Sequence, residues 1–130
     1  MNENFSDDLK RVLKLSKNEA NRLGHSYIGS EHFLLGIMKD KNGKASKLIS
    51  KLGINNSEII SYIETISKPK SGSVALGHLP LTRRAEKILR NTQKEAKNKN
   101  KNTADQIDFL LSIASEKEGL AFEALSTFSK

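Results

Sequence analysis

The sequence has 130 residues, of which 36% are hydrophobic and 28% charged, enough apolar material for one domain with a single modest core. No stretch approaches the ~20 consecutive apolar residues of a membrane-spanning helix, and the first residues lack the apolar run of a secretory signal, so no membrane partner is expected. Cysteine is absent, which excludes disulfides, thiolate metal sites and thiol nucleophiles and agrees with a cytoplasmic location.

The net charge of +7 is unevenly distributed along the chain. Much of the excess lies between residues 94 and 101, with further arginines and a lysine between residues 83 and 90. A basic face can attract nucleic acid, an anionic surface or an acidic partner. No Phe or Tyr lies among these lysines, although a stacking platform for single-stranded nucleic acid would need them. The pattern favours the solvated end of a helix, and nucleic acid is not an expected partner.

An internal repeat is the most informative feature of the sequence. Residues 5–54 align without a gap with residues 81–130, at a constant offset of 76. Repeated structural units normally bury their cores against one another, which predicts one domain made of two similar halves. The clearest matches are Phe33-Leu34-Leu35-x-Ile37 with Phe109-Leu110-Leu111-x-Ile113, and Lys41-x-Gly43-x-Ala45 with Lys117-x-Gly119-x-Ala121.

The first segment of each half has the apolar spacing of an amphipathic helix. Ser6 and Thr82 stand where an N-cap hydroxyl would accept a hydrogen bond from an unpaired backbone N–H. Acidic residues follow Ser6 and suit the positive end of a helix, whereas Arg83 and Arg84 follow Thr82 and do not. This mismatch either marks a position that faces a partner or is an exposed charge that costs little stability. The two stripes are Phe5, Leu9, Val12, Leu13, Ser16, Ala20 and Leu23, and Leu81, Ala85, Ile88, Leu89, Thr92 and Ala96.

Further helices are predicted after each of these segments. A second helix should begin near Ser30, and its copy near Thr103–Gln106, which has the pattern of a capping box. A third helix should follow Gly43 and stop at Gly53, and a fourth should span residues 57–66.

The second half ends before any counterpart of the fourth helix, because Lys130 aligns with Ile54. Either the chain was cut from a longer protein or this copy is naturally short. Without such a helix, Phe122, Leu125 and Phe128 should be left partly uncovered.

Together these patterns predict an all-α domain of about seven or eight short helices in two pseudo-symmetric repeats, with no sheet. The first repeat should span residues 5–67 and the second residues 81–130. Residues 68–80 carry both prolines and are predicted to form a linker, the most mobile internal segment. The isoleucine-rich fourth helix and the grooves between the repeats are the better candidates for contact with a partner.

Four segments of the first half resemble a known family. The segments that look like the double Clp N-terminal motif are Phe5-Ser6-x-x-Leu9, Glu19–His25, Tyr27–Ile37 and Gly43–Ala45. This motif forms the N-terminal domain of Clp-family ATPases, and the similarity is greatest to the ClpC branch. The resemblance covers almost the whole chain, with a specific first copy and a degenerate second copy.

The resemblance implies a binding domain rather than an enzyme. In the family, this domain is tethered above an ATPase ring and receives protein substrates and adaptor proteins for unfolding and degradation. The implied partners are therefore substrates and adaptors, with a Clp ATPase ring and the Clp protease as further partners. No cofactor is expected in this chain, because ATP would belong to an ATPase module beyond Lys130.

Two alternatives to this interpretation are kept. A stand-alone regulator that competes with a Clp N-terminal domain would share the fold. A small basic helical protein that binds nucleic acid through residues 83–101 would come from a different functional class, and its binding should weaken steeply with added salt.

The resemblance also implies a candidate ligand site. Some ClpC-type members bind phosphorylated arginine through a hydroxyl residue at the start of the first helix of each copy and a glutamate that opens the second helix. The matching residues are Ser6, Thr82 and Glu31, whereas the second glutamate position holds Ile107. Isoleucine cannot pair with a guanidinium group, so the site that relies on this position should be weakened or lost.

The residues alone give these positions a simpler role. Glu31 is an acid in the first turn of a helix, which the helix dipole favours by roughly 0.3–1 kcal/mol. Ser6 and Thr82 are helix caps, and an anion can bind beside them because helix N-termini present unpaired N–H groups.

No catalytic or metal site is predicted. His25, His32 and His78 lack the spacing of metal ligands, and the first two are interpreted as packing or capping residues. The sequence contains no Gly-x-Ser-x-Gly motif and no P-loop pattern. ATP binding and enzymatic activity by this chain are therefore not expected.

Overall fold

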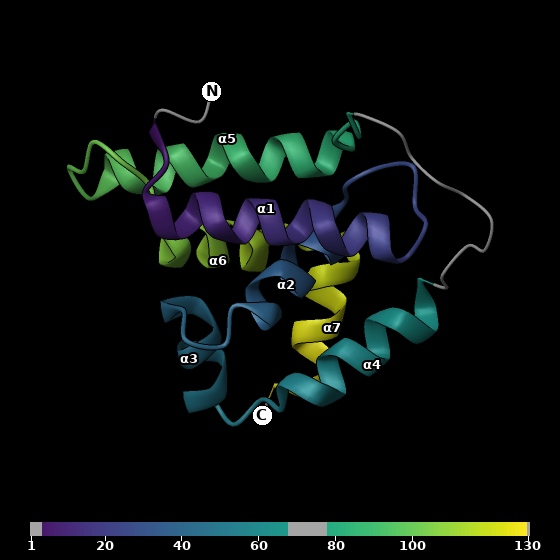
Figure 1. The fold of residues 1–130 in the computed structure, drawn as a ribbon. Coiled ribbons are helices and arrows are strands. Elements are labelled where there is room, and N and C mark those ends of the chain that lie inside the picture. Colours follow the sequence, from purple (N-terminus) through teal and green to yellow (C-terminus); the bar gives the residue numbers. More distant parts are fainter. Residues whose placement is uncertain (1–3, 68–77, 130) are drawn as a thin grey trace.

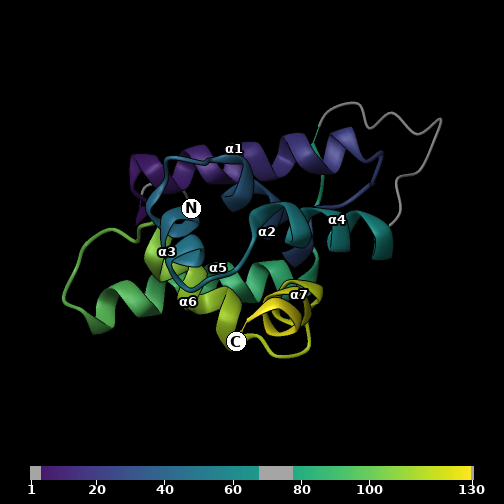
Figure 2. The ribbon, with the colours of Figure 1, turned by 90° about the horizontal axis from the view of Figure 1, so that it is seen from below.

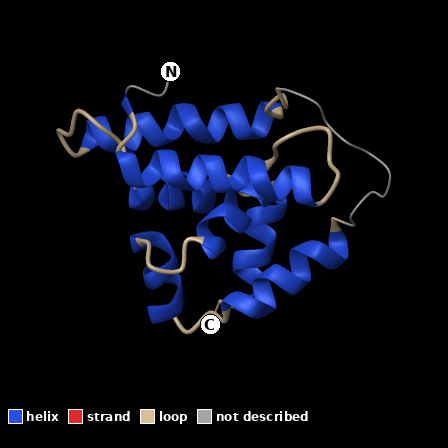
Figure 3. Cartoon of the chain, in the orientation of Figure 1, coloured by secondary structure: helices blue, strands red, loops and turns tan. Residues whose placement is uncertain are grey.

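A computed structural model describes residues 4–67 and 78–129, and these residues form seven helices and no sheet, as predicted (Figures 1 and 3). Most of the predicted linker lies outside the described residues. No helix within them is long and apolar enough to cross a membrane. The helices are α1 (Asp7–Arg22), α2 (Ser30–Lys39), α3 (Lys44–Lys51), α4 (Asn56–Ile66), α5 (Arg83–Asn98), α6 (Gln106–Ser115) and α7 (Leu120–Phe128).

The helices repeat with the period of the sequence. α5, α6 and α7 begin 76 residues after α1, α2 and α3, respectively. α4 is the one helix of the described residues that has no counterpart in the other half.

The segment before the first helix of each half forms backbone hydrogen bonds with the other half. Phe5 forms an isolated parallel bridge with Ala104, and Leu81 forms the corresponding bridge with Ile28. Two backbone hydrogen bonds close each bridge, both of 2.8 Å at Ala104 and of 2.8 and 3.0 Å at Ile28. The segment that leads into α1 is therefore attached to the second half, and the segment that leads into α5 to the first (Figure 1).

The core lies where α2 and α6 meet. Phe33 and Phe109 contact each other edge to face, with ring centroids 4.9 Å apart. α1 packs on α2 and α5 packs on α6, while α7 contacts α2, α4 and α6. Figure 1 shows α1 and α5 on the upper side of the molecule and α3, α4 and α7 on the lower side. Apolar residues of the predicted stripes, among them Leu9, Val12 and Ile88, are buried in this core.

The start of α6 corrects one expectation. The capping box predicted at Thr103–Gln106 is wrong, because Ala104 is held in the extended bridge to the first half and the helix begins only after it. The N-cap is Asp105, whose Oδ1 accepts from the N–H groups of Ile107 and Asp108 at 3.0 and 3.1 Å. The side chain of Asp108 accepts in return from the N–H of Asp105 at 3.0 Å, so two carboxylates close this helix end.

Left-handed residues follow three of the helices. Gly53 follows α3 with φ 82°, where the helix was predicted to stop, and Gly24 follows α1 with φ 71°. Asn100 takes the place of Gly24 in the second half, with φ 60°. Asparagine tolerates this conformation better than most residues that carry a side chain.

Candidate functional site

Ser6 and Thr82 are both N-caps, as predicted. Ser6 Oγ accepts from the N–H of Leu9 at 3.4 Å and donates to the carboxylate of Asp8. Thr82 Oγ1 accepts from the N–H of Ala85 at 3.1 Å. Each hydroxyl therefore lies at the positive end of a 16-residue helix, where an anion is stabilised.

The backbone bridges decide which hydroxyl lies beside which acid position. The N–H of Thr82 donates at 3.0 Å to the carbonyl of Ile28, three residues before Glu31. The N–H of Ser6 donates in the same way, at 2.8 Å, to the residue three positions before Ile107. Both candidate sites are thus shared between the halves. We call the pair of Thr82 and Glu31 the Thr82 site, and the pair of Ser6 and Ile107 the Ser6 site.

The charges beside the two sites are opposite. Arg83, Arg84 and Glu86 occupy the first turn of α5, at the Thr82 site, whereas Asp7 and Asp8 occupy the first turn of α1, at the Ser6 site. The Thr82 site therefore brings a helix N-terminus that begins with two arginines near the start of α2, which carries Glu31. This arrangement suits a ligand that carries an anion and a cation together.

The Ser6 site is surrounded by carboxylates of the chain itself. Nζ of Lys44 lies 3.9 Å from Oδ2 of Asp8 and 3.5 Å from Oδ2 of Asp105, and so bridges the starts of α1 and α6. Lys101 also pairs with Asp105, at 3.5 Å. An anionic ligand would have to compete with these acids for the same positive groups.

Arg84 has a local role that accounts for its place in a first helical turn. Its Nε lies 3.5 Å from Oε2 of Glu116, and Nζ of Lys87 lies 3.2 Å from Oε1 of the same residue. A Cβ atom added at Gly119 would lie 2.9 Å from Cδ of Arg84 and 3.0 Å from Oγ of Ser30. The methylene chain of Arg84 therefore passes over the N-terminus of α7, next to Ser30, the first residue of α2.

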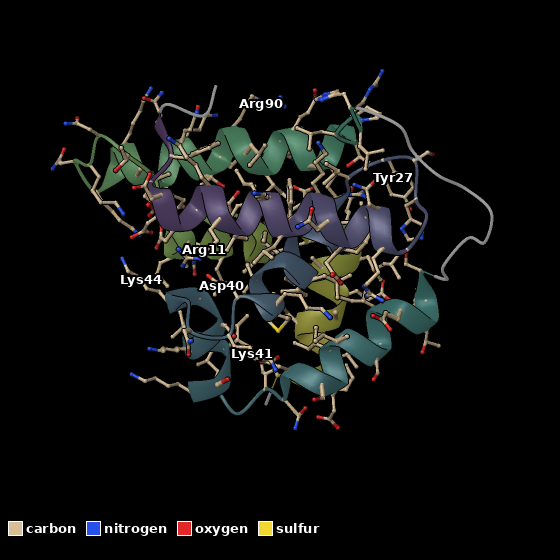
Figure 4. All side chains as sticks on the ribbon, in the orientation of Figure 1. Arg11, Tyr27, Asp40, Lys41, Lys44 and Arg90 are labelled. Atoms are coloured by element: carbon tan, nitrogen blue, oxygen red, sulfur yellow. The ribbon has the colours of Figure 1, made fainter. Side chains whose placement is uncertain are left out.

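Glu31 lies half-buried in the first turn of α2. Its Oε2 accepts from the hydroxyl of Tyr27 at 3.3 Å. Burial, together with the charge of Glu31, raises the pKa of Tyr27, so this hydroxyl stays protonated. A Cβ atom at Gly29 would lie 2.5 Å from Oε1 of Glu31, which shows that the carboxylate folds back over the backbone at the helix start. Figure 4 shows Tyr27 on the loop between α1 and α2.

A pair of buried histidines supports this helix start, in agreement with the predicted packing and capping role. Nδ1 of His32 accepts from the N–H of Gly29 at 2.9 Å, and Nε2 of His32 lies 2.7 Å from Nδ1 of His25. His25 stacks on Tyr27 with ring centroids 5.5 Å apart. Burial, helped by neighbouring His25, outweighs the opposing charges of Glu31 and Glu19 and lowers the pKa of His32 to about 4. Within the described part of the chain, no three His, Asp or Glu residues gather as a metal site.

Asp108 takes the place of His32 in the second half. It is fully buried, and Lys99 and Lys101 pair with its two oxygens at 2.7 and 2.6 Å. Burial opposes ionisation, but the hydrogen bonds from Lys101, Lys99 and the N–H of Asp105 outweigh it and lower the pKa of Asp108 to about 2. The basic stretch after α5 is therefore more than a solvated helix end, because two of its lysines neutralise a buried acid.

Gln106 is a buried residue whose role the sequence did not indicate. Its Nε2 donates to the carbonyl of Asp8 at 3.0 Å and to Oδ2 of Asp40 at 2.8 Å, and its Oε1 accepts from the N–H of Ala45 at 3.2 Å. Arg11 pairs with Asp40 at 3.0 Å, and Figure 4 shows these two side chains pointing toward each other between α1 and α3. The side-chain amide of Gln106 thus joins the starts of α1, α3 and α6. It holds the N-terminus of α6 beside that of α1 at the Ser6 site.

Comparison with known proteins gives a family match over nearly the whole chain. Residues 4–128 match the family model described as the Clp repeat (R) N-terminal domain. The chaperone protein ClpC, chloroplastic, of Pisum sativum is 35% identical over 125 residues, which are 96% of this chain and 13% of that protein. The ATP-dependent Clp protease ATP-binding subunit ClpA homolog of Guillardia theta is 33% identical over 129 residues, 99% of this chain and 16% of that protein. The chain therefore spans only 13–16% of the length of these relatives.

Solved structures share the fold at low sequence identity. The N-terminal domain of Hsp104 from Candida albicans has a TM-score of 0.79 at 13% identity, covering 96% of this chain and 81% of that one. The N-terminal domain of the chaperone ClpD from Arabidopsis thaliana has a TM-score of 0.76 at 16% identity, covering 96% and 84%. These similarities confirm the all-α architecture of two repeats.

Proposed function

Because the chain belongs to the Clp repeat N-terminal domain family, we propose that it receives protein substrates and adaptor proteins for a Clp-type ATP-dependent unfoldase. The full-length relatives are named as a chaperone and as an ATP-binding subunit of the Clp protease, so a Clp ATPase ring and the Clp protease are the proposed assemblies. In this proposal the chain binds its partners in the cytoplasm, catalyses no reaction and holds no cofactor of its own.

A competition experiment tests this function. The chain is added in excess to a degradation reaction of the Clp protease from the same organism. We expect adaptor-dependent degradation to slow, because the added chain binds the adaptor, while adaptor-independent degradation continues at its usual rate. Equal rates with and without the chain in both reactions would contradict the proposal.

Within this function, the Thr82 site is proposed to bind a ligand of the phosphoarginine type. The observation that carries this proposal is the hydrogen bond from the N–H of Thr82 to Ile28, which holds the start of α5 beside the start of α2. The phosphoryl group would meet the N-terminus of α5 with Arg83, since Arg84 is paired with Glu116, and the guanidinium group would meet Glu31. The Ser6 site is not proposed to bind it, because Ile107 supplies no acid there.

Titration with a phosphoarginine peptide tests the ligand. We expect one saturable site per chain, with an affinity at least tenfold lower in Glu31→Ala, equivalent to about 1.4 kcal/mol. Thr82→Ala should weaken binding, whereas Ser6→Ala, which removes the matched N-cap of the other half, should leave it unchanged. Two sites, or equal effects of Thr82→Ala and Ser6→Ala, would contradict the assignment.

The alternatives differ in how well the structure supports them. A stand-alone regulator would have the same fold and would also pass the competition test, so only the gene's reading frame beyond Lys130 separates it from a domain of an unfoldase. Binding of nucleic acid through residues 83–101 is less well supported, because Lys99 and Lys101 are committed to Asp108. A salt-dependent affinity for DNA that falls on removal of the remaining lysines would restore that alternative.

A further inference from the structure

Three aromatic rings pack together at the start of α2, beside the carboxylate of Glu31. Tyr27 stacks on the buried His25 with an interplanar angle of 1°, and it meets the buried His32 at a tilt of 56°, with ring centroids 5.4 Å apart. The two histidines are also 2.7 Å apart at their ring nitrogens. The ring of Tyr27 is therefore held by two buried side chains. Figures 1 and 2 both place the loop that carries it at the end of the molecule where α5 begins.

The hydroxyl of Tyr27 donates to Oε2 of Glu31 at 3.3 Å. The other oxygen, Oε1, folds over Gly29, where a Cβ atom would lie only 2.5 Å away. A glutamate side chain without such contacts samples several rotamers, and ordering it on binding costs entropy. The hydroxyl on one side and the missing Cβ on the other therefore fix the plane of this carboxylate. A guanidinium group pairs with a carboxylate through two parallel N–H···O bonds, so a carboxylate with a fixed plane binds it at a lower entropic cost.

The second half has lost this arrangement together with the acid. Residues 76 positions later differ at every member of the set: Lys101 for His25, Thr103 for Tyr27, Asp105 for Gly29, Ile107 for Glu31 and Asp108 for His32. There, Lys101 pairs with Asp108 at 2.6 Å, so an ion pair takes the place of the two histidines. A helix can thus begin at this place in the fold without the aromatic rings. The rings accompany the half that keeps the glutamate, which indicates a role for Tyr27 beyond support of the helix.

We propose that Tyr27 is a positioning residue of the Thr82 site, and that its hydroxyl orients the carboxylate of Glu31 toward the guanidinium group of the ligand. This inference rests on the proposed phosphoarginine-type ligand of that site. Tyr27 acts through Glu31, since its hydroxyl contacts the carboxylate that would meet the ligand. A tyrosine with a purely structural role would act through its stacked ring, which phenylalanine keeps.

Titration of Tyr27→Phe with a phosphoarginine peptide tests this role. Only the hydroxyl is removed, so the affinity should fall about three- to tenfold, as expected for the loss of one hydrogen bond. Tyr62→Phe is the matched control, because the hydroxyl of Tyr62 also donates to a glutamate, Oε1 of Glu123 at 2.8 Å, but joins α4 to α7. The control should bind like the wild type, and circular dichroism checks that both variants are folded.

A double-mutant cycle separates positioning from structural support. If the hydroxyl acts through Glu31, adding Tyr27→Phe to Glu31→Ala should cause no further loss of affinity. A structural role would weaken binding by the same factor with and without Glu31.

Ultraviolet absorbance measures the contact without a ligand. The chain has two tyrosines and no tryptophan, so the phenolate signal of a Tyr62→Phe chain comes from Tyr27 alone. Burial and the charge of Glu31 raise the pKa of Tyr27, so adding Glu31→Ala to this chain should bring the measured pKa closer to that of a free tyrosine.

The inference is overturned if Tyr27→Phe binds like the Tyr62→Phe control, or if its loss of affinity is undiminished without Glu31. It is also overturned if Tyr27 titrates alike with and without Glu31. In these cases the proposed ligand stands as long as Glu31→Ala weakens binding. A wild type that does not bind the peptide overturns both proposals.

Discussion

His32 shows how the burial of one side chain makes the stability of the domain depend on pH. The ordinary pKa of histidine is about 6.5, and burial lowers that of His32 to about 4. Between these values the unfolded chain binds a proton that the folded chain does not, so the contribution of His32 is complete above about pH 6.5 and is lost as the pH falls toward 4. The loss should be on the order of 3 kcal/mol over this range.

Urea unfolding of the wild type and of His32→Asn at pH 7 and pH 5 checks this prediction. Asparagine keeps an oxygen that can accept from the N–H of Gly29 but does not titrate, so the variant should lose much less stability on acidification. His78→Asn, at an exposed histidine, should keep the full pH dependence of the wild type. An identical pH dependence in His32→Asn and the wild type would show that another group is responsible.

Matched positions of the two halves hold different residues, and this explains why some contacts at the site could not be predicted. His32 and Asp108 occupy matching places and both accept a backbone N–H at the start of a helix. The sequence suggested a capping role for His32 but gave no sign that Lys99 and Lys101 neutralise a buried acid, because that contact forms only when α6 packs beside the end of α5. Local sequence patterns can predict helix caps, whereas ion pairs across a loop depend on how the helices pack.

At the scale of the helices, Gly36 sets how closely α1 and α2 approach. A Cβ atom there would lie 2.7 Å from the carbonyl oxygen of Val12 and 2.9 Å from the backbone nitrogen of Ser16. Both atoms belong to the backbone and cannot rotate away. In an open helix, Gly→Ala would stabilise by up to about 1 kcal/mol, but here we expect Gly36→Ala to destabilise the domain by about 1–3 kcal/mol through overpacking.

The second half supplies the control for this prediction. Ser112 replaces Gly36 there, and its Oγ donates to the carbonyl of Ile88 at 2.7 Å. Ser112→Ala removes this hydrogen bond without a clash and should cost only about 1 kcal/mol. Chemical denaturation of both variants measures their free energies of unfolding. A Gly36→Ala protein more stable than the wild type would show that α1 and α2 can move apart at little cost in stability.

Most helices could be predicted because their signals are local. The start of α6 was predicted near Thr103 from a capping pattern, but the helix begins at Gln106, which is 76 residues after the first residue of α2. The offset carried information about tertiary structure, since it aligned α6 with α2 and so allowed for the bridge that keeps Ala104 extended. The pattern at Thr103 considered only neighbouring residues and missed this bridge.

At the scale of the whole molecule, the exchange between the halves decides what the candidate site is. The family resemblance implied Ser6, Thr82 and Glu31 as site residues but not their pairing, because the bridges that join Thr82 to the first half and Ser6 to the second are contacts between distant segments. Once that pairing is known, the departure at Ile107 falls on the Ser6 site, and the Thr82 site keeps its acid.

The same exchange predicts that neither half folds alone. A fragment of residues 1–67 would lose the partners of Phe5 and Ile28 and would expose Phe33, which packs on Phe109 in the intact domain. We expect this fragment and a fragment of residues 78–130 to lack cooperative thermal unfolding when separate, and to regain helicity and a cooperative transition when mixed. Circular dichroism of each fragment and of the mixture is the measurement.

Phe109→Ala in the second fragment should prevent reassembly, since such a core truncation costs about 3–5 kcal/mol. Cooperative unfolding of either fragment alone would mean that each repeat is stable without the exchanged contacts.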